Sequence, residues 1–257
     1  MNRLATLLLS LVTACAIAMP PVAPATAPAA YAATTTGSST AISSPYSSTY
    51  IYYSDLAFKD GGSATIAVGK TRKLTLINLS DGDISWVSSD DNVATVMQNG
   101  IVKAKHAGVT RVTAKNLKTH RSVTCTVKVY KKCTQAQARK AILALKATYY
   151  PGRRWTNSNY YYWQAANCHC YGCIAFVGIA SDRAFGQFAP LKRHANFSGI
   201  KVGDHVRIAG SHSVIVLYKK KKSVVVAEGN YDSTFKWGRS ITQASLMRQG
   251  FYVETRY

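Results

Sequence analysis

The feature that most constrains the fold of this 257-residue chain is a series of short runs in its first half that alternate apolar and polar residues or carry β-branched side chains. Turn clusters such as Asp60-Gly61-Gly62 and Asn99-Gly100 separate these runs at roughly the spacing of hairpins. The runs lie at residues 73–79, 83–89, 93–97 and 122–130. Because such strands must bury an apolar face, the pattern predicts a small all-β sandwich.

The same region, residues 50–131, resembles the bacterial Ig-like domains of group 2. Four pieces carry the resemblance in order: Trp86-Val-Ser-Ser, Val93-Ala-Thr-Val, Asn99-Gly-Ile-Val and Ala107-Gly. The resemblance implies an Ig-like sandwich that serves as a spacer or an adhesive module of a surface protein.

Cys125 lies in the last run of this region, on the same strand face as Val123, Val127 and Val129. A free cysteine behaves as a small apolar residue when it is buried. We therefore expect a buried thiol in the core rather than a disulfide between Cys125 and Cys133.

The N-terminus has the features of an export signal. A short basic segment precedes an uncharged apolar run that is shorter than the ~20 residues a bilayer core requires. The small-x-small site Ala30-Tyr31-Ala32 predicts cleavage after Ala32, and a lipid on Cys15 is the alternative. Residues 1–32 are thus predicted to be a signal peptide, and the Ser/Thr-rich residues 33–49 a linker.

The formal net charge is +21, which indicates an anionic partner. With an export signal and without a recognition motif for nucleic acid, the expected partner is peptidoglycan or another anionic cell-wall polymer. We expect a bacterial protein that is secreted, extracellular or associated with the cell wall. No membrane span is expected after the signal is removed, and we expect a monomer.

A second region, residues 132–257, begins with a predicted helix. Thr134 and Gln137 have the spacing of a capping box. Apolar side chains then recur at helical spacing until Pro151-Gly152; they are Ala138, Ile142, Leu145 and Tyr149. The aromatic segment "RRWTNSNYYYW" (153–163) is predicted to be a loop, whose rings either stack on sugars or pack beneath a helix.

The segment "CHCYGC" (168–173) concentrates three of the six cysteines. A metal site is disfavoured because four ligands in six residues close a tetrahedron poorly, so we expect neither metal nor cofactor. A disulfide between Cys168 and Cys170 would close a very small, strained ring, whereas pairing either one with Cys133 is possible in an exported protein. The redox state of Cys168 and Cys170 stays open.

Cys173 is the preferred nucleophile. Gly172 precedes it, a helical apolar pattern follows it, and Gly186 lies where the helix should end. A cysteine at a helix N-terminus has a lowered pKa because the free backbone N–H groups and the helix dipole stabilise its thiolate. The same N–H groups can hold an oxyanion.

His212 is the preferred base because it opens the apolar strand "HSVIVLY" behind the flexible Gly210-Ser211. The next strand, "SVVVAEGNY" (223–231), follows a lysine-rich tip and presents Glu228 and Asn230 on one face. Either residue could orient the His212 ring, depending on the register. The hypothesis requires an odd number of residues in the tip.

The order "YGCIAF", "IKVGDHVRI", "HSVIVL" and "VVVAEGNY" resembles papain-like bacterial wall hydrolases of the CHAP group and their NlpC-type relatives. The resemblance covers about residues 135–257. It implies a papain-like α+β domain, with helices packed on a small antiparallel sheet, in addition to the all-β sandwich. It also implies that Cys173 attacks an amide, that His212 acts as base, and that Glu228 with Asn230 orients the ring.

The expected function is therefore that of an exported cysteine peptidase or amidase that cleaves an amide bond of peptidoglycan. A non-catalytic surface protein that binds the wall is the alternative from another class. A third possibility keeps the same residues but acts on protein cross-links, as transglutaminase-like relatives do.

Overall fold

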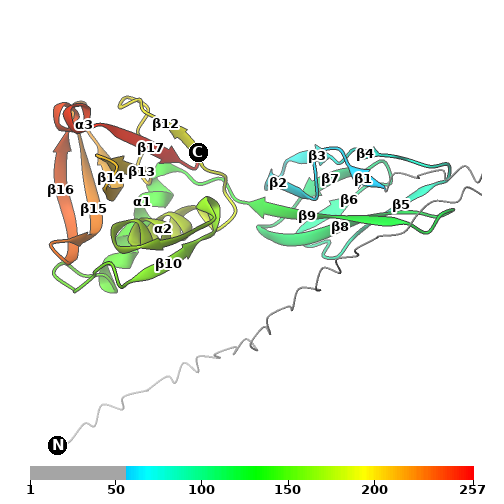
Figure 1. The fold of residues 1–257 in the computed structure, drawn as a ribbon, viewed down its shortest axis with the longest axis horizontal. Helices are drawn as coiled ribbons and strands as arrows, with labels where there is room; N and C mark the ends of the chain where they lie inside the picture. Colours follow the sequence, from blue (N-terminus) through cyan, green and yellow to red (C-terminus); the bar gives the residue numbers. More distant parts are fainter. Residues whose placement is uncertain (1–55) are drawn as a thin grey trace, which may run out of the picture. The chain divides into compact units, whose positions relative to one another are not determined.

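A computed structural model describes residues 56–257 of the chain (Figure 1). The predicted signal peptide, the lipid alternative at Cys15 and the linker lie outside the described residues. All described residues belong to one compact unit. Within this described range, no helix is both long enough and apolar enough to cross a bilayer.

Strands β1 to β9 form the part of the fold that precedes Lys131. The strands are β1 Ala57–Phe58, β2 Ser63–Ala67, β3 Thr71–Lys73, β4 Leu76–Ile77, β5 Ile84–Ser88, β6 Ala94–Val96, β7 Ile101–Ala104, β8 Gly108–Asn116 and β9 Ser122–Tyr130. A four-stranded sheet (β2-β9-β8-β5) and a three-stranded sheet (β3-β7-β6) share one core, while β1 pairs with β4. The predicted sandwich is therefore confirmed for this region.

The core of these two sheets holds Cys125 as a free thiol without exposed area, as the alternation of its strand predicts. Val127 and Val129 lie beside it along β9 and are also fully buried. Burial raises the pKa of the Cys125 thiol, since the low-dielectric core disfavours the thiolate. Cys125 is thus an inert core residue.

Helices and further strands follow from Gln135 onward. They are α1 Gln135–Ala144, β10 Tyr160–Trp163, β11 Cys168–Tyr171, α2 Gly172–Phe185, β12 Lys192–His194, β13 His205–Ile208, β14 His212–Lys219, β15 Ser223–Tyr231, β16 Thr234–Thr242, α3 Gln243–Gln249 and β17 Phe251–Thr255, with 3-10 turns at Leu145–Ala147 and Gln164–Ala166. Six of the strands form one antiparallel sheet in the order β12-β17-β13-β14-β15-β16, and β10 pairs with β11.

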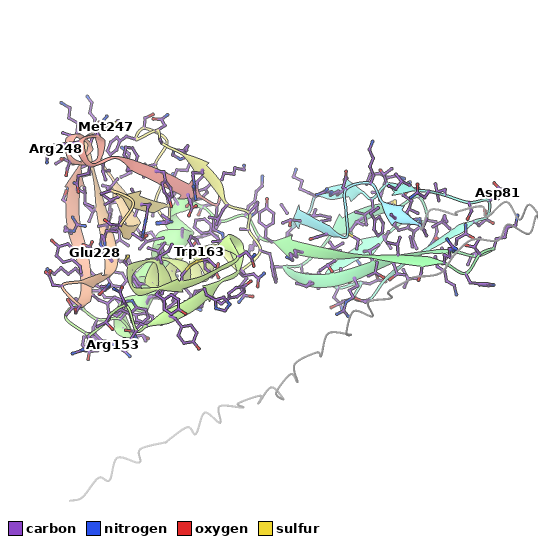
Figure 2. All side chains as sticks on the ribbon, viewed as in Figure 1. Asp81, Arg153, Trp163, Glu228, Met247 and Arg248 are labelled. Carbon is purple, nitrogen blue, oxygen red and sulfur yellow. A yellow bond between two sulfur atoms is a disulfide. The ribbon has the colours of Figure 1, made fainter. Side chains whose placement is uncertain are left out.

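Two apolar clusters cover the two faces of the six-stranded sheet because side chains alternate along β14 and β15. One cluster packs Ile215 and Ala227 against Phe176 of α2. The other packs Val216 and Val226 against each other and against Leu246 of α3. Trp163 and Glu228 are among the largest fully buried side chains of this part, and Figure 2 labels both.

The prediction of an all-β sandwich plus a separate papain-like α+β domain is wrong. Strands account for 44 % of the structure and helices for 18 %, and the described residues form one compact unit. Part of the error is local, because the aromatic segment predicted to be a loop ends in a strand, and other segments form elements that the sequence analysis did not assign. The aromatic segment that ends at Trp163 forms β10, the cysteine segment forms β11, and the polar segment after Asp232 forms β16 and α3.

The predicted start of α1 and the predicted end of α2 are confirmed, whereas α1 ends at Ala144, before the predicted end at Pro151-Gly152. Thr134 caps α1, and Gln137 completes the capping box. Gly186 ends α2 with a φ of 74°, in the left-handed region that favours glycine. Local capping chemistry therefore fixes where Cys173 lies along its helix.

Gly229 allows α2 and Trp155 to approach β15 closely. A Cβ atom at this position would lie 2.8 Å from Trp155, 2.9 Å from Phe176 and 3.0 Å from Phe235. These rings belong to the cluster that supports α2. Only a residue without a side chain fits between them.

We therefore expect Gly229→Ala to lower the free energy of unfolding by roughly 1–3 kcal/mol, because added atoms overpack a filled core. Denaturant unfolding of the full chain measures this effect. Gly62→Ala is the matched control, since its Cβ would meet only the Thr124 carbonyl oxygen at 3.7 Å. Equal stability of the two variants would contradict the packing described here.

Candidate functional site

Cys173 is the second residue of α2, at the N-terminal end of the helix. Its side chain is 8 % exposed. The N-cap residue, Tyr171, makes no side-chain hydrogen bond to the backbone N–H groups at this end of the helix. The sulfur therefore lies where the helix dipole favours a negative charge.

His212 lies beside this sulfur as the first residue of β14. Its Nε2 atom lies 2.8 Å from Oε2 of Glu228, and its ring lies close enough to Cys173 for the two groups to shift each other's pKa. Because Nε2 is engaged by Glu228, the nitrogen left for the sulfur is Nδ1. The structure thus brings three of the four sequence-predicted residues together in one row, with His212 between Glu228 and Cys173.

Asn230, the fourth predicted residue, contacts a different part of the site. Its Nδ2 donates to Oδ1 of Asn157 at 2.7 Å. This pair packs against Gly172, where an added Cβ would lie 2.3 Å from Asn157 Oδ1 and 2.9 Å from Asn230 Nδ2. Asn230 therefore supports the start of α2, and Glu228 is the residue that holds the His212 ring.

The pairing at the tip of the β14–β15 hairpin differs from the one that the sequence analysis required. Tyr218 lies opposite Val225, which leaves an even number of residues in the tip, so the requirement for an odd tip is wrong. A β-bulge between Val216 and Tyr218 shifts the register, so that Val216 lies opposite Val226. Such a bulge inserts one residue and reverses the parity of the strand before it, which restores the face that His212 needs.

Glu228 has no exposed surface, and Arg239 of β16 satisfies most of its charge. Arg239 donates from Nε to Oε1 at 2.5 Å and from Nη2 to Oε2 at 2.6 Å. Sequence reasoning missed this residue because the segment that forms β16 was not recognised as a strand. Its alternation after the β15 hairpin is the signal that could have located it.

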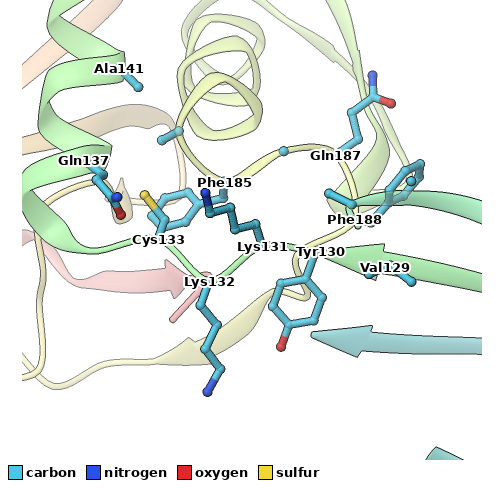
Figure 3. Close-up of a pocket in the computed structure, with 14 residues that line it drawn as sticks. Val129, Tyr130, Lys131, Lys132, Cys133, Gln137, Ala141, Phe185, Gln187 and Phe188 are labelled. Atoms are coloured by element: carbon cyan, nitrogen blue, oxygen red, sulfur yellow. The ribbon is translucent and has the colours of Figure 1, made fainter. Parts of the chain in front are cut away.

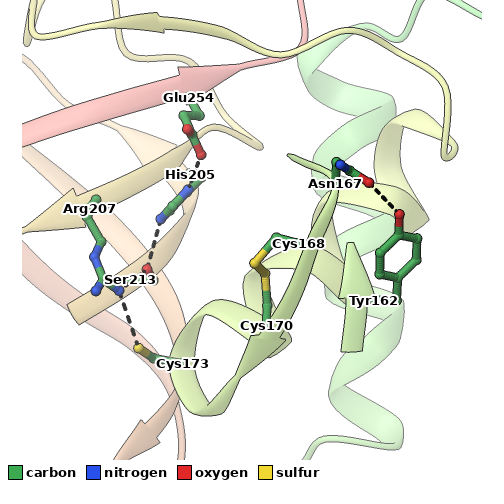
Figure 4. The surroundings of a disulfide bond; sticks show 9 residues. All are labelled: Tyr162, Asn167, Cys168, Cys170, Cys173, His205, Arg207, Ser213 and Glu254. Atoms are coloured by element: carbon green, nitrogen blue, oxygen red, sulfur yellow. Dashed lines mark hydrogen bonds and ion pairs between the residues drawn. A yellow bond between two sulfur atoms is a disulfide. The ribbon is translucent and has the colours of Figure 1, made fainter. Parts of the chain in front are cut away.

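A second polar row approaches Cys173 from β13 and β17 (Figure 4). Nη1 of Arg207 lies 3.9 Å from the sulfur and 2.9 Å from Ser213 Oγ. Ser213 Oγ lies 2.9 Å from Nε2 of the buried His205, whose Nδ1 lies 2.9 Å from Glu254 Oε2. A carboxylate only accepts, so His205 donates from Nδ1, Ser213 donates to Nε2, and Arg207 donates to Ser213.

The electrostatics of the site favour a thiolate–imidazolium pair. Burial raises the pKa of Cys173. This effect is outweighed by hydrogen bonds from His212 and the Ser213 backbone and by the charges of His212 and Arg207, which lower the pKa of the thiol below 9.0. Burial lowers the pKa of His212, but its hydrogen bonds with Cys173 and Glu228 outweigh it and raise the pKa to about 9. The two groups titrate as a coupled pair.

Glu228 stays ionised for the same reason. Burial raises the pKa of its carboxyl group, but hydrogen bonds from Arg239 and His212 outweigh burial and hold the pKa below its ordinary value. The negative charge of Glu228 therefore remains next to His212 over the range in which the imidazole titrates.

Cys168 and Cys170 form a disulfide with each other, which is the pairing that the sequence analysis disfavoured. Cys133 and Cys173 are free. Figure 4 shows the Cys173 side chain pointing toward Arg207 and away from the disulfide. The nucleophile is therefore not part of the disulfide.

A surface pocket of about 480 Å³ lies elsewhere and includes Cys133 and Phe185 among its lining residues (Figure 3). None of the four predicted site residues lines it. Among the described residues, no three His, Cys, Asp or Glu side chains are placed to share a metal ion.

Comparison with known proteins identifies the region before this site. Residues 59–127 match the family described as bacterial Ig-like domain (group 2). This region is a bacterial Ig-like domain. The family match ends at residue 127, and the CHAP or NlpC-type resemblance of the residues around Cys173 stays a prediction from the sequence.

Two further proteins are similar to parts of the chain. A 3-O-alpha-D-galactosyl-alpha-L-arabinofuranosidase of Bifidobacterium longum subsp. longum is 40 % identical over 57 residues, which are 21 % of this chain and 5 % of that enzyme. The chain thus spans about one-twentieth of that relative. A crystal structure of an EHEC O157:H7 intimin mutant aligns with 74 % of this chain and 93 % of its own, at 12 % identity and a TM-score of 0.27, which is too low to indicate a shared fold.

The lowered pKa of Cys173 is testable against a second cysteine of the same chain. Burial raises the pKa of Cys133, against the charge of Lys131, so Cys133 serves as an internal control. We expect alkylation by iodoacetamide to reach its half-maximal rate at a lower pH at Cys173 than at Cys133. Mass spectrometry of the alkylated peptides resolves the two rates, and identical pH profiles would refute the ion pair.

Proposed function

We propose that the chain is an exported cysteine hydrolase that cleaves an amide bond of peptidoglycan. One observation carries the chemical class: Cys173 at a helix N-terminus lies beside His212, and a buried Glu228 holds the His212 ring. A nucleophile, a base and a group that orients the base are the parts that nucleophilic catalysis requires. The described order of motifs, which resembles the CHAP and NlpC-type hydrolases, supports the same class.

In the proposed reaction, the Cys173 thiolate attacks the amide carbonyl carbon and forms a tetrahedral intermediate. The backbone N–H groups at the start of α2 stabilise its oxyanion. His212 gives its proton to the leaving amine, the C–N bond breaks, and a thioester remains on Cys173. His212 then takes a proton from water, and the resulting hydroxide attacks the thioester carbon. The C–S bond breaks, the acid product leaves, and Cys173 is again a thiolate beside the protonated His212.

Arg239 and Arg207 have separate roles in this proposal. Arg239 keeps Glu228 ionised and in place, so that Glu228 accepts from Nε2 of His212 and leaves Nδ1 toward the sulfur. Arg207 adds a positive charge 3.9 Å from the sulfur, which stabilises the thiolate before attack. Both are positioning residues, since neither exchanges a proton with the substrate.

The choice of peptidoglycan rests on the whole chain rather than on the catalytic row. A net charge of +21 favours an anionic polymer, and the export signal places the chain outside the cytoplasm in this proposal. Bacterial Ig-like domains of group 2 commonly act as spacers or adhesive modules, so the Ig-like domain would hold the enzyme at the wall. Its presence also supports the second candidate, a wall-binding protein without activity.

Replacement of Cys173 separates these two functions. We expect the full chain to release new amino groups from peptidoglycan, and Cys173→Ala to reduce the rate at least about 10³-fold. Cys133→Ala, which changes a free cysteine outside the row, is the matched control and should keep the activity. Mass spectrometry of the released fragments measures the reaction and identifies the bond.

The pH dependence of the same reaction should follow the ion pair. The rate rises as Cys173 loses its proton and falls as His212 loses its proton near about 9. A rate that is unaffected by Cys173→Ala would refute the assigned nucleophile. If neither the unsubstituted chain nor any variant releases amino groups from several types of peptidoglycan, the hydrolase assignment fails and the wall-binding function is favoured.

A further inference from the structure

The hairpin formed by β10 and β11 has two faces of different chemistry. Antiparallel pairing places Tyr160 opposite Tyr171 and Tyr162 opposite His169. Because side chains alternate, these four rings share one face, which we call the aromatic face. The ring centroids are 6.3 Å apart in the first pair and 4.8 Å apart in the second.

The opposite face of the hairpin packs on the protein. It carries Tyr161, Trp163, Cys168 and Cys170, all members of or neighbours to the cluster that supports α2. Tyr161 and Trp163 lie against Gly178 of α2, where a Cβ atom would approach both at 3.0 Å. The hairpin is therefore fixed to the catalytic helix through its inner face.

The aromatic face is exposed to solvent. Exposed fractions are 67 % for Tyr160, 55 % for Tyr171 and 38 % for Tyr162, and His169 is exposed as well. Rings of this size usually bury most of their area, and exposed apolar groups gathered on one face mark an interaction site. The sequence analysis left open whether the aromatic rings of this segment bind sugars or pack beneath a helix. In β10, Tyr160 and Tyr162 face solvent, whereas Tyr161 and Trp163 pack on the protein.

The position of this face relates it to Cys173. Tyr171 is the N-cap residue of α2 and lies two positions before the nucleophile. The disulfide between Cys168 and Cys170 ties two positions of β11 on the inner face. A ligand on the aromatic face thus lies on a preorganised surface whose strand β11 continues along the chain into the catalytic helix.

We propose that the aromatic face binds the pyranose rings of a neutral glycan that belongs to the same substrate as the scissile amide. The inference rests on the proposed function and adds the glycan as the second part of the substrate. The C–H face of a sugar ring packs on a tyrosine ring, while phenol hydroxyl and imidazole groups exchange hydrogen bonds with sugar hydroxyl and acetamido groups.

The charge of the hairpin favours a sugar over other ligands. Residues 160–171 contain no Lys, Arg, Asp or Glu, although the chain as a whole carries +21. A single-stranded nucleic acid would also stack its bases on aromatic rings, but it requires basic side chains for its phosphates. An anionic membrane surface likewise requires basic residues around the aromatic ones. A neutral ring-shaped ligand fits the face as it is.

Isothermal titration of the full chain carrying Cys173→Ala tests the proposal, because this chain binds without turnover. The probe is a soluble tetrasaccharide of β-1,4-linked N-acetylglucosamine. We expect Tyr160→Ser with Tyr162→Ser to weaken binding at least about tenfold, or about 1.4 kcal/mol. Tyr160→Phe with Tyr162→Phe keeps the rings and should retain most of the affinity.

The matched control is Tyr150→Ser, which removes a tyrosine that is 55 % exposed and lies outside the hairpin. Equal affinity of the double serine variant and the Tyr150→Ser control would overturn the proposal, as would the absence of tetrasaccharide binding. Tight binding of a single-stranded oligonucleotide in place of the tetrasaccharide would also overturn it.

The two proposals fail separately. If the tetrasaccharide binds through the aromatic face but the chain with Cys173 cleaves no peptidoglycan, the hydrolase assignment fails alone. If the chain cleaves peptidoglycan but the tyrosine substitutions leave tetrasaccharide binding unchanged, the glycan site fails alone.

Discussion

The buried carboxylate of Glu228 is the constraint on which the rest of the site depends. A carboxylate without exposed area is stable in a protein only when charged and hydrogen-bonded partners surround it. Arg239 and His212 are those partners, and they lie on the two strands that flank β15. Three neighbouring strands must therefore be in register before the site exists.

The packing around this carboxylate explains how a thiol on a helix reaches a base on a strand. The cluster under α2 holds the helix against β14 and β15, and Gly229 leaves room for that approach. Asn230 then braces the start of the helix through Asn157. The two residues that flank Gly229 thus position the two reacting groups: Glu228 holds the base, and Asn230 supports the helix that carries the nucleophile.

Much of this could be predicted from the sequence because it follows from local periodicity. The Ig-like domain, the burial of Cys125 and the position of Cys173 at a helix start all depend on patterns within a few residues. The separate papain-like domain was wrong. The aromatic segment around Tyr160, predicted to be a loop, forms a strand, and so does the segment around Arg239, to which the sequence analysis assigned no element. Aromatic and charged residues fit an exposed strand face as well as a loop, so composition does not distinguish them.

The choice between Glu228 and Asn230 could not be made from alternation. Both residues share a face of β15, and the bulge near Tyr218 brings His212 to that face without distinguishing between them. A β-bulge is a backbone irregularity that depends on packing between strands, and no sequence motif in this hairpin predicts it. The disulfide between Cys168 and Cys170 was missed for a similar reason, because a strand partner holds that segment extended.

The central claim is that the buried carboxylate of Glu228 keeps the His212 imidazole charged beside Cys173. The protonation state of His212 tests this claim most directly. Nitrogen-15 NMR of the ring reports this state in the full chain and in Glu228→Gln, with His205 as the buried reference histidine. The account predicts an imidazolium at neutral pH that loses its proton near about 9, and a lower pKa in Glu228→Gln. A neutral His212 ring at pH 7 in the unsubstituted chain would contradict it.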